Sequence, residues 1–296
     1  MSNNATISNN LKFNVKLFLY KLKILFLRII GYEKPLRVAF LKYLSLKFFT
    51  FRPHYETLMY ESAKSAIKLG YNKIDVIELG VAGGNGIKSF LKYKKKIENI
   101  IDIKINIVGF DSGSGLPFID NKKDLPFFWK QGDYTNKSLD KLEKEDKNLS
   151  IFEGNIENTL DKYISKNENK IGLILFDLDL YSSTKIFLDK IKKLSEKNLL
   201  LPRVFCYFDD LFIADYHLDD TNGEPLAIKE FNDQYKDLKL GKTFDHINDF
   251  KFPLAKGQVY TLHDLNNSDY NKYIGIYSED SLSEKEDNKF RSILND

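Results

Sequence analysis

The segment VIELGVAGGNG, residues 76–86, decides which fold this chain is expected to adopt. It ends an apolar run over residues 73–79, and a helical pattern over residues 85–95 follows it. Glycine lets the backbone of such a turn approach a ligand closely, because there is no side chain in the way. The backbone amides at the start of the helix can then contact polar groups of that ligand. The segment therefore predicts a strand, a ligand-binding turn and a helix in succession.

An acidic residue within this segment indicates which ligand the turn binds. Glu78 lies two residues before the first glycine, whereas a dinucleotide-binding turn has G-x-G-x-x-G directly after the strand. This arrangement favours S-adenosylmethionine. Asp111 ends the next predicted strand, where an acid can accept hydrogen bonds from a ribose. The residues predicted to bind the donor are Glu78, Gly80, Val81, Gly83, Gly84, Gly86, Asp111 and Ser112. The simpler alternatives are a tight turn without a ligand and, for Asp111, a helix or turn cap.

Helical and strand patterns alternate from His54 onward, as is typical of a mostly parallel sheet with helices on both faces. Apolar strands are expected at residues 73–79, 105–110, 149–152, 171–176 and 203–208. Residues 257–262 and 273–277 are expected to complete the sheet as antiparallel strands. We therefore predict a Rossmann-like α/β fold with a seven-stranded sheet.

Two pairs of aspartates follow the fourth and fifth predicted strands. Asp177 and Asp179 come directly after one apolar run, and Asp209 and Asp210 come directly after the next. Neighbouring parallel strands place their carboxyl ends side by side, so four carboxylates are expected near one crevice. Crowded carboxylates repel one another, and a divalent cation with oxygen ligands, Mg²⁺ or Mn²⁺, relieves that repulsion. Caps of helices and turns are the simpler explanation, but they account for one or two of the four.

The composition bears on the class of partner and on the compartment. The chain has 296 residues and a net charge of +3, which gives no support to nucleic acid as a partner. Its single cysteine, Cys206, cannot form an intrachain disulfide, so a reducing cytoplasm is the expected location. The N-terminus does not have the pattern of a signal peptide.

The chain is expected to divide into a helical extension over residues 1–52, the α/β domain over residues 53–277 and a charged tail over residues 278–296. Residues 11–52 contain ten Lys or Arg and one acid. A basic, apolar helix of this kind can lie on an anionic membrane, so peripheral contact with the inner face of the membrane is one prediction. The alternative is a pair of helices that pack on the α/β domain or across a homo-oligomer interface.

With these motifs the chain resembles the macrocin O-methyltransferase family, whose members methylate sugar hydroxyls. The likeness covers about residues 52–235. The segments that carry it are residues 78–86, 109–111, 115–117, 132–134, 176–184 and 208–210 and, more weakly, 227–231. The resemblance implies a class I methyltransferase fold, S-adenosylmethionine as the methyl donor and a sugar or glycan hydroxyl as the acceptor. It further implies that Asp177, Asp209 and Asp210 bind Mg²⁺ and that Asp179 is the general base.

The chain departs from the family pattern at two places. Residues 112–114 read Ser-Gly-Ser where the family usually has an aromatic residue and an acid, and residues 198–202 lack the usual pair of glycines. His217 offers a competing base, because the pKa of an unperturbed imidazole suits that role better than that of a carboxylate. We expect the acceptor pocket to be formed by the loops at residues 121–134 and 215–225.

Two other classes of function fit part of the sequence. The Asp177-x-Asp179 pattern is similar to the metal-binding Asp-x-Asp of nucleotide-sugar glycosyltransferases, although that interpretation leaves residues 78–86 unexplained. A membrane-associated Rossmann-like binding protein without catalytic activity is the other alternative, and the four aspartates argue against it.

Overall fold

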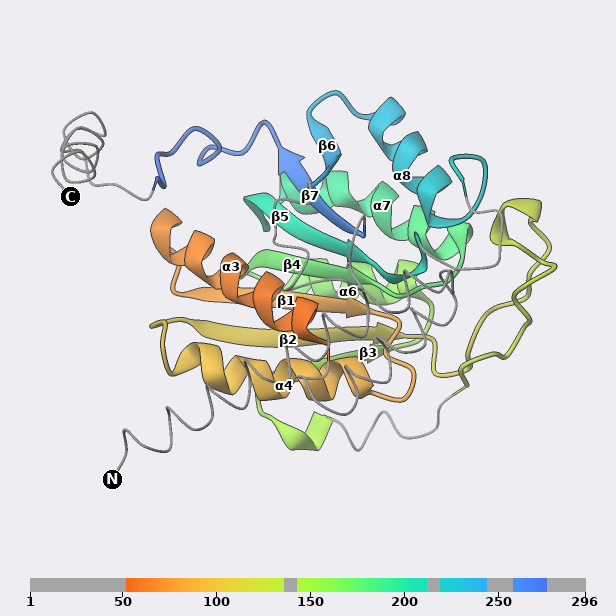
Figure 1. Ribbon diagram of the computed structural model, residues 1–296, viewed down its shortest axis with the longest axis horizontal. Coiled ribbons are helices and arrows are strands. Elements are labelled where there is room, and N and C mark those ends of the chain that lie inside the picture. Colours follow the sequence, from red (N-terminus) through yellow and green to blue (C-terminus); the bar gives the residue numbers. More distant parts are fainter. Residues whose placement is uncertain (1–51, 136–142, 212–218, 244–257, 276–296) are drawn as a thin grey trace, which may run out of the picture.

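The computed structural model describes residues 52–135, 143–211, 219–243 and 258–275. These residues form one seven-stranded sheet in the order β3-β2-β1-β4-β5-β7-β6 (Figure 1). The strands are β1 (Lys73–Leu79), β2 (Lys104–Asp111), β3 (Leu149–Glu153), β4 (Lys170–Phe176), β5 (Leu200–Phe208), β6 (Leu238–Lys242) and β7 (Val259–Asp264). The first five strands pair in parallel, and β7 runs antiparallel to both of its neighbours, β5 and β6. This is the predicted Rossmann-like α/β fold with a mostly parallel seven-stranded sheet.

The connections between the strands decide which face of the sheet each helix covers. The described α-helices are α3 (Pro53–Leu69), α4 (Asn85–Glu98), α6 (Ile156–Lys166), α7 (Tyr181–Glu196) and α8 (Gly223–Gln234). The chain moves in one direction through α4 from β1 to β2, and in the opposite direction through α7 from β4 to β5. Right-handed crossovers therefore put α4 and α7 on opposite faces. α3 packs on α4, and α7 packs on both α6 and α8 (Figure 1).

The centre of the sheet is apolar, and its packing aligns the carboxyl ends of β4 and β5 with each other. Every residue of β4 is buried, and β1 is buried except for its first residue. At the ends of β4 and β5 the rings of Phe176 and Phe208 are partners in the register and stack with centroids 4.2 Å apart. The residues that follow them, Asp177 and Asp209, are thereby brought to the same edge of the sheet, as the sequence predicted.

The C-terminal strands differ in part from the prediction. The strand expected at residues 257–262 is confirmed as β7, but residues 273–275 are not a strand, and the edge is formed by β6 instead. The β6 segment alternates buried Leu238 and Leu240 with half-buried Lys239 and Gly241, which is the period-2 pattern of a strand with one buried face. Tyr273, by contrast, is 62% exposed and has no such buried face.

The two ends of the chain lie outside the described residues. The predicted extension (residues 1–52) is described at Arg52 alone, and the predicted tail (residues 278–296) is not described. The domain boundaries, the peripheral membrane contact through residues 11–52 and the homo-oligomer therefore stay predictions. Among the described helices, none combines the length and apolar character that crossing a membrane requires.

Candidate active site

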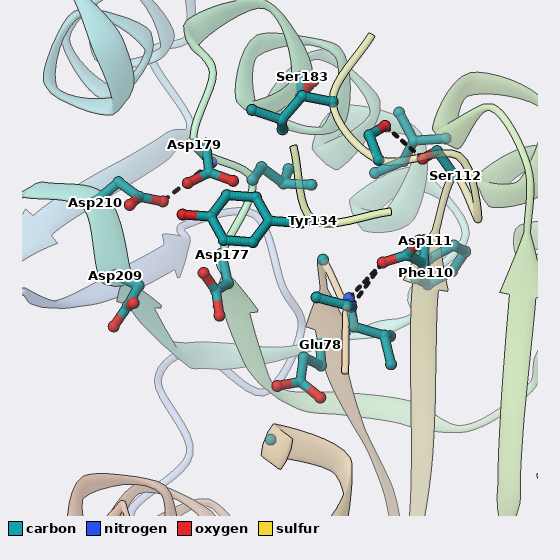
Figure 2. Close-up of a pocket in the computed structure, with 18 of the residues that line it drawn as sticks. Glu78, Phe110, Asp111, Ser112, Tyr134, Asp177, Asp179, Ser183, Asp209 and Asp210 are labelled. Carbon is teal, nitrogen blue, oxygen red and sulfur yellow. Dashed lines mark hydrogen bonds between the residues drawn. The ribbon is translucent and has the colours of Figure 1, made fainter. Parts of the chain in front are cut away.

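A cavity of about 570 Å³ opens at the carboxyl ends of β1, β2, β4 and β5 (Figure 2). It lies where the connections leave β1 and β4 in opposite directions, which is the place where open α/β sheets bind ligands. Most of the residues predicted for the two halves of the site line it. They are Glu78, Gly80, Val81, Gly83, Gly86, Asp111 and Ser112 on the donor side, and Asp177, Asp179, Asp209 and Asp210 on the acidic side. Gly84 is the exception: it does not line the cavity but forms the N-cap of α4, with a φ of 75°.

The turn after β1 depends on Gly80, where two strand ends meet. Gly80 has a φ of 84°, and a Cβ atom added there would lie 1.8 Å from the carbonyl oxygen of Asp177. The amide of Asp177 in turn donates to the carbonyl of Leu79 at 2.9 Å. Any other residue at position 80 would therefore separate β1 from β4 at the floor of the cavity. By contrast, a Cβ at Gly83 would meet no atom nearer than 3.9 Å, so the turn is open at that residue.

Glu78 is a buried carboxyl group with an unused acceptor. Its side chain is 1% exposed, and its Oε2 atom makes no hydrogen bond to the described residues. Burial raises the pKa of Glu78 to about 8, against the effect of the nearby Arg52 and with the support of the neighbouring aspartates. Gly86 makes room for this carboxyl, because a Cβ there would lie 1.6 Å from Oε1. Such a group fits a ligand that brings a positive charge or a hydrogen-bond donor.

Asp111 has a structural role that the sequence left as an alternative. Its Oδ2 atom accepts hydrogen bonds from the amides of Val81 and Ala82 at 2.9 and 2.8 Å, and its Oδ1 atom accepts from Gly113 at 2.7 Å (Figure 2). Asp111 therefore holds the glycine turn in place, and its Oδ1 atom, which accepts one hydrogen bond, keeps acceptor capacity for a ribose. Ser112 is exposed, and its hydroxyl donates to the carbonyl of Gly115 at 2.8 Å within its own loop.

The acidic side brings the four predicted aspartates together. The amide of Asp179 donates to Oδ2 of Asp210 at 3.0 Å, which links the end of β4 to the end of β5 (Figure 2). Asp209 accepts a hydrogen bond from the Tyr207 hydroxyl at 2.8 Å. Asp179 is buried and has a φ of 61°, an uncommon conformation for a residue other than glycine. Backbone strain of this kind clusters at functional sites.

Burial and mutual repulsion both act on these carboxyl groups. Burial, followed by the charge of Asp209, raises the pKa of Asp177 to about 8, and Arg52 opposes the rise. The same two causes raise the pKa of Asp179 to about 7. Burial, followed by the charges of Asp179 and Asp177, raises the pKa of Asp210 well above its ordinary value. A cation that bound here would therefore remove a repulsion already built into the fold.

The donor chemistry of the acidic side fits a hard divalent cation, because every candidate ligand is a carboxylate oxygen. The side-chain positions do not form a finished site, however. In the part of the chain that the structure describes, no group of three or more His, Cys, Asp and Glu side chains has the arrangement needed to hold a metal ion. Metal binding by Asp177, Asp209 and Asp210 accordingly stays a prediction.

Glu224 is a further carboxyl group, in contact with Asp210 on the acidic side, that the sequence did not indicate. It lies in the first turn of α8 and is fully buried, and its Oε2 atom accepts the amide of Asp210 at 3.2 Å. Its Oε1 atom has no hydrogen-bond partner among the described residues. Burial, followed by the charges of Asp210 and Asp209, raises the pKa of Glu224 well above its ordinary value. A local sequence pattern cannot single out this residue, because an acid in the first turn of a helix is commonplace on protein surfaces.

Tyr134 is a second residue with a place in the site that the sequence did not assign individually. Figure 2 shows its ring between Asp111 and the aspartates, with the hydroxyl toward Asp179 and Asp210. The side chain is 55% exposed, and its backbone has a φ of 63°. Loss of hydration, followed by the charge of Asp179, raises the pKa of its hydroxyl to about 12. An aromatic ring in this position gives an acceptor a surface to stack on.

The loop that precedes Tyr134 is anchored to the domain at several points. Asp124 is buried and accepts the amide of Ser182 at 2.7 Å, so a residue of this loop caps α7. Lys123 forms an ion pair of 2.9 Å with Glu230 of α8. Leu125 and Trp129 form a small apolar cluster with Leu180. The cluster and these polar contacts hold the predicted acceptor loop, residues 121–134, beside the aspartates.

The other predicted base and the second acceptor loop are described in part or not at all. His217 lies outside the described residues, as do residues 215–218 of the loop at 215–225. His217 therefore stays a prediction as the alternative to Asp179. The Ser-Gly-Ser departure at residues 112–114 forms a turn in which the amide of Ser114 donates to the Ser112 hydroxyl at 3.2 Å, and the Thr135 hydroxyl donates to the carbonyl of Ser114 at 3.0 Å.

No protein-family model and no curated protein sequence matches the chain. Several solved methyltransferase structures are similar to it. CalS11, a calicheamicin methyltransferase, is 22% identical with a TM-score of 0.49, and the match covers 80% of this chain and 89% of CalS11. The O-methyltransferase NovP is 14% identical with a TM-score of 0.43, over 71% and 79% of the two chains. An O-methyltransferase from Bacillus cereus in complex with SAH is 10% identical with a TM-score of 0.37, over 75% and 94%.

One architecture can serve many substrates, so the chemistry of this chain has to be derived from its own site. The resemblance to the macrocin O-methyltransferase family stays a prediction that rests on the sequence motifs.

Proposed function

We propose that this chain is an S-adenosylmethionine-dependent O-methyltransferase that acts on a hydroxyl of a sugar or glycan with the help of Mg²⁺ or Mn²⁺. The observation that carries the proposal is the single cavity in which the glycine turn with Glu78 faces the aspartates that follow β4 and β5. A methyl donor and a hydroxyl acceptor must meet in one space, and this cavity offers a different chemistry to each.

On the donor side, S-adenosylmethionine would lie across the ends of β1 and β2. The open turn at Gly83 would let the donor approach the backbone, and the carboxyl of Asp111 would accept from the ribose. The buried acceptor of Glu78 would meet the positively charged end of the donor. Asp111 also holds the turn itself, so the donor site is formed before the ligand arrives.

On the acidic side, the acceptor hydroxyl must be aligned with the donor methyl group and must lose its proton. In the proposed transfer a hydroxyl oxygen would attack the methyl carbon, the carbon–sulfur bond would break, and S-adenosylhomocysteine would leave. The proton of the hydroxyl would go to Asp179, a buried carboxyl in the short segment that links β4 to α7. Alignment supplies much of the rate, because the donor is already activated.

Asp177, Asp209 and Asp210 would hold the divalent cation. The cation would supply Lewis-acid polarisation, which lowers the pKa of a bound sugar hydroxyl. The chain's own contribution is to keep the three carboxyl groups at one edge of the sheet through the Phe176–Phe208 register and the bond from the Asp179 amide to Asp210. The loop at residues 121–134 would receive the acceptor, with Tyr134 as a stacking surface.

A transfer assay with methyl-labelled S-adenosylmethionine and a panel of sugars, nucleotide sugars and glycans tests the proposal. We expect labelled product from at least one acceptor, and we expect EDTA to reduce the rate and Mg²⁺ or Mn²⁺ to restore it. If EDTA leaves the rate of transfer unchanged, no divalent cation takes part in the reaction, and S-adenosylmethionine would still be the methyl donor. Hydrolysis or transfer of a nucleotide sugar, without binding of S-adenosylmethionine, would establish the glycosyltransferase alternative.

A further inference from the structure

Arg52 is a positive charge at the acidic end of the cavity, and the sequence assigned it to the basic extension. It directly precedes α3, and its side chain lines the cavity together with Glu78 and the glycine turn. The guanidinium carbon lies 4.9 Å from the centroid of the Tyr55 ring, and Nη1 hydrogen-bonds to the Tyr55 hydroxyl. Nη1 also lies 3.8 Å from Oδ2 of Asp177. The guanidinium is therefore fixed inside the site by its neighbours.

The electrostatic surroundings of Arg52 are strongly negative. Burial alone would lower the pKa of the Arg52 guanidinium, but the groups around it, Tyr55 and Glu78 foremost, more than reverse this and raise it. The positive charge of Arg52 in turn opposes the rise in the pKa of Glu78. Arg52 and Glu78 thus place a guanidinium and a buried carboxyl group in the lining of one cavity, and Glu78 keeps an unused buried acceptor atom.

A ligand that fits this wall carries both charges on one carbon. An α-amino acid has an ammonium group, which a buried carboxyl attracts, and a carboxylate, which a guanidinium binds through two parallel hydrogen bonds. Without Arg52, a ligand carboxylate would face the acidic groups around it, namely Glu78, Asp177 and Asp209. The wall therefore has the charge pattern of a receptor for an amino-acid zwitterion.

We propose that Arg52 binds the carboxylate of the amino-acid end of the methyl donor while Glu78 faces its ammonium group. The inference rests on the proposed function in so far as the donor is S-adenosylmethionine. It adds that the last residue of the predicted extension completes the donor site. Arg52 has a left-handed backbone, with a φ of 54°, directly before Pro53, and its side chain lines the cavity.

The test compares two ligands that differ in the amino-acid end alone. S-adenosylhomocysteine carries that end, and 5′-methylthioadenosine has the same nucleoside thioether without it. Calorimetry on the full chain should show that wild type prefers S-adenosylhomocysteine, and that Arg52→Gln weakens its binding by about tenfold or more, the usual effect of losing a charge-assisted pair. The affinity for 5′-methylthioadenosine should change by less than about twofold, and Arg52→Lys should bind S-adenosylhomocysteine with intermediate affinity.

Arg203→Gln is the matched control, because Arg203 also stacks on a tyrosine, with 5.0 Å from its guanidinium carbon to the Tyr270 ring, but does not line the cavity. It should leave the ratio of the two affinities unchanged. Equal losses for both ligands in Arg52→Gln, or no loss for S-adenosylhomocysteine, would overturn the inference. A wild type that binds neither ligand would instead overturn the proposed function.

A double variant separates ligand binding from a simple counter-ion role toward Asp177. If Arg52 only neutralises Asp177, Asp177→Asn should restore the binding of S-adenosylhomocysteine to Arg52→Gln, and the inference would be wrong. If Arg52 binds the donor carboxylate, the double variant should retain most of the defect.

Discussion

On the donor side of the cavity Asp111 is held by backbone amides, whereas on the acidic side several carboxyl groups are buried close together. Asp111 accepts three amide hydrogen bonds, and the turn that it holds is complete without a ligand. On the acidic side, the pKa values of Asp177, Asp179, Asp210 and Glu224 are all raised by burial and then by one another. The comparison indicates a preformed donor site beside a second site that becomes favourable when protons or a cation bind.

The largest effect is expected from breaking the donor side at Gly80. Gly80→Ala should abolish measurable donor binding, because its Cβ would overlap the carbonyl oxygen of Asp177. Gly70→Ala is the matched control: Gly70 has a similar φ of 95°, but its Cβ would meet no atom nearer than 3.7 Å. Both variants lose about 1 kcal/mol of stability or more from the left-handed backbone, but calorimetry should show lost binding in Gly80→Ala alone. Unchanged donor affinity in Gly80→Ala would mean that the donor binds elsewhere.

The next largest effect concerns the acidic side and leaves the donor side intact. Asp179→Asn should reduce methyl transfer by about 10²- to 10⁴-fold, the usual contribution of a general base, while donor affinity stays within about twofold. Rates from labelled transfer and affinities from calorimetry would be measured on the same preparation. Asp189→Asn, which changes an aspartate on the outer surface of α7, is the control. A full rate in Asp179→Asn would favour His217 as the base.

Divalent cations should stabilise the acidic side specifically. Millimolar Mg²⁺ or Mn²⁺ should raise the melting temperature of wild type by several degrees, because a ligand that binds the folded state alone stabilises it by mass action. Asp210→Asn should lose this response, and Gly70→Ala should keep it. A rise in melting temperature that is equal in wild type and Asp210→Asn would place the cation outside this cluster.

The smallest effect expected is a pH-dependent one at Glu224. Its pKa is higher in the folded than in the unfolded chain, so the folded state binds more protons, and stability falls as the pH rises above the unfolded value of about 4.3. Glutamine at position 224 cannot ionise. The free energy of unfolding of Glu224→Gln should therefore increase relative to that of wild type as the pH rises, by at most about 1.4 kcal/mol per pH unit. Urea unfolding of metal-free protein between pH 5 and pH 8 measures this, with the exposed Glu168→Gln as the control. A gap between Glu224→Gln and wild type that closes as the pH rises would contradict it.

The site residues that lie at or directly after the end of a strand could be predicted from the sequence. A glycine turn after an apolar run places Glu78 and Gly80, and parallel pairing places Asp177 beside Asp209, because each feature depends on one strand and its neighbour. The role of Asp111 was half predicted: its position was right, but the hydrogen bonds to Val81 and Ala82 depend on how two loops meet.

The residues that were missed reach the site from other elements. Glu224 arrives through the docking of α8, and Arg52 through its position directly before α3, so neither has a local pattern that marks it. Gly84 was assigned to the donor site but serves α4, because the same left-handed glycine conformation can begin a helix or admit a ligand. The short edge strand β6 has a recognisable alternation, but five residues are few for a sequence signal.

The most direct test of a preformed donor site is calorimetry of S-adenosylmethionine and of a UDP-sugar with wild type and Gly80→Ala, each with and without Mg²⁺. We predict that wild type binds S-adenosylmethionine even without the metal, because the donor side is complete by itself, and that Gly80→Ala does not bind it. Binding of the UDP-sugar alone, and only in the presence of Mg²⁺, would contradict this account of the site.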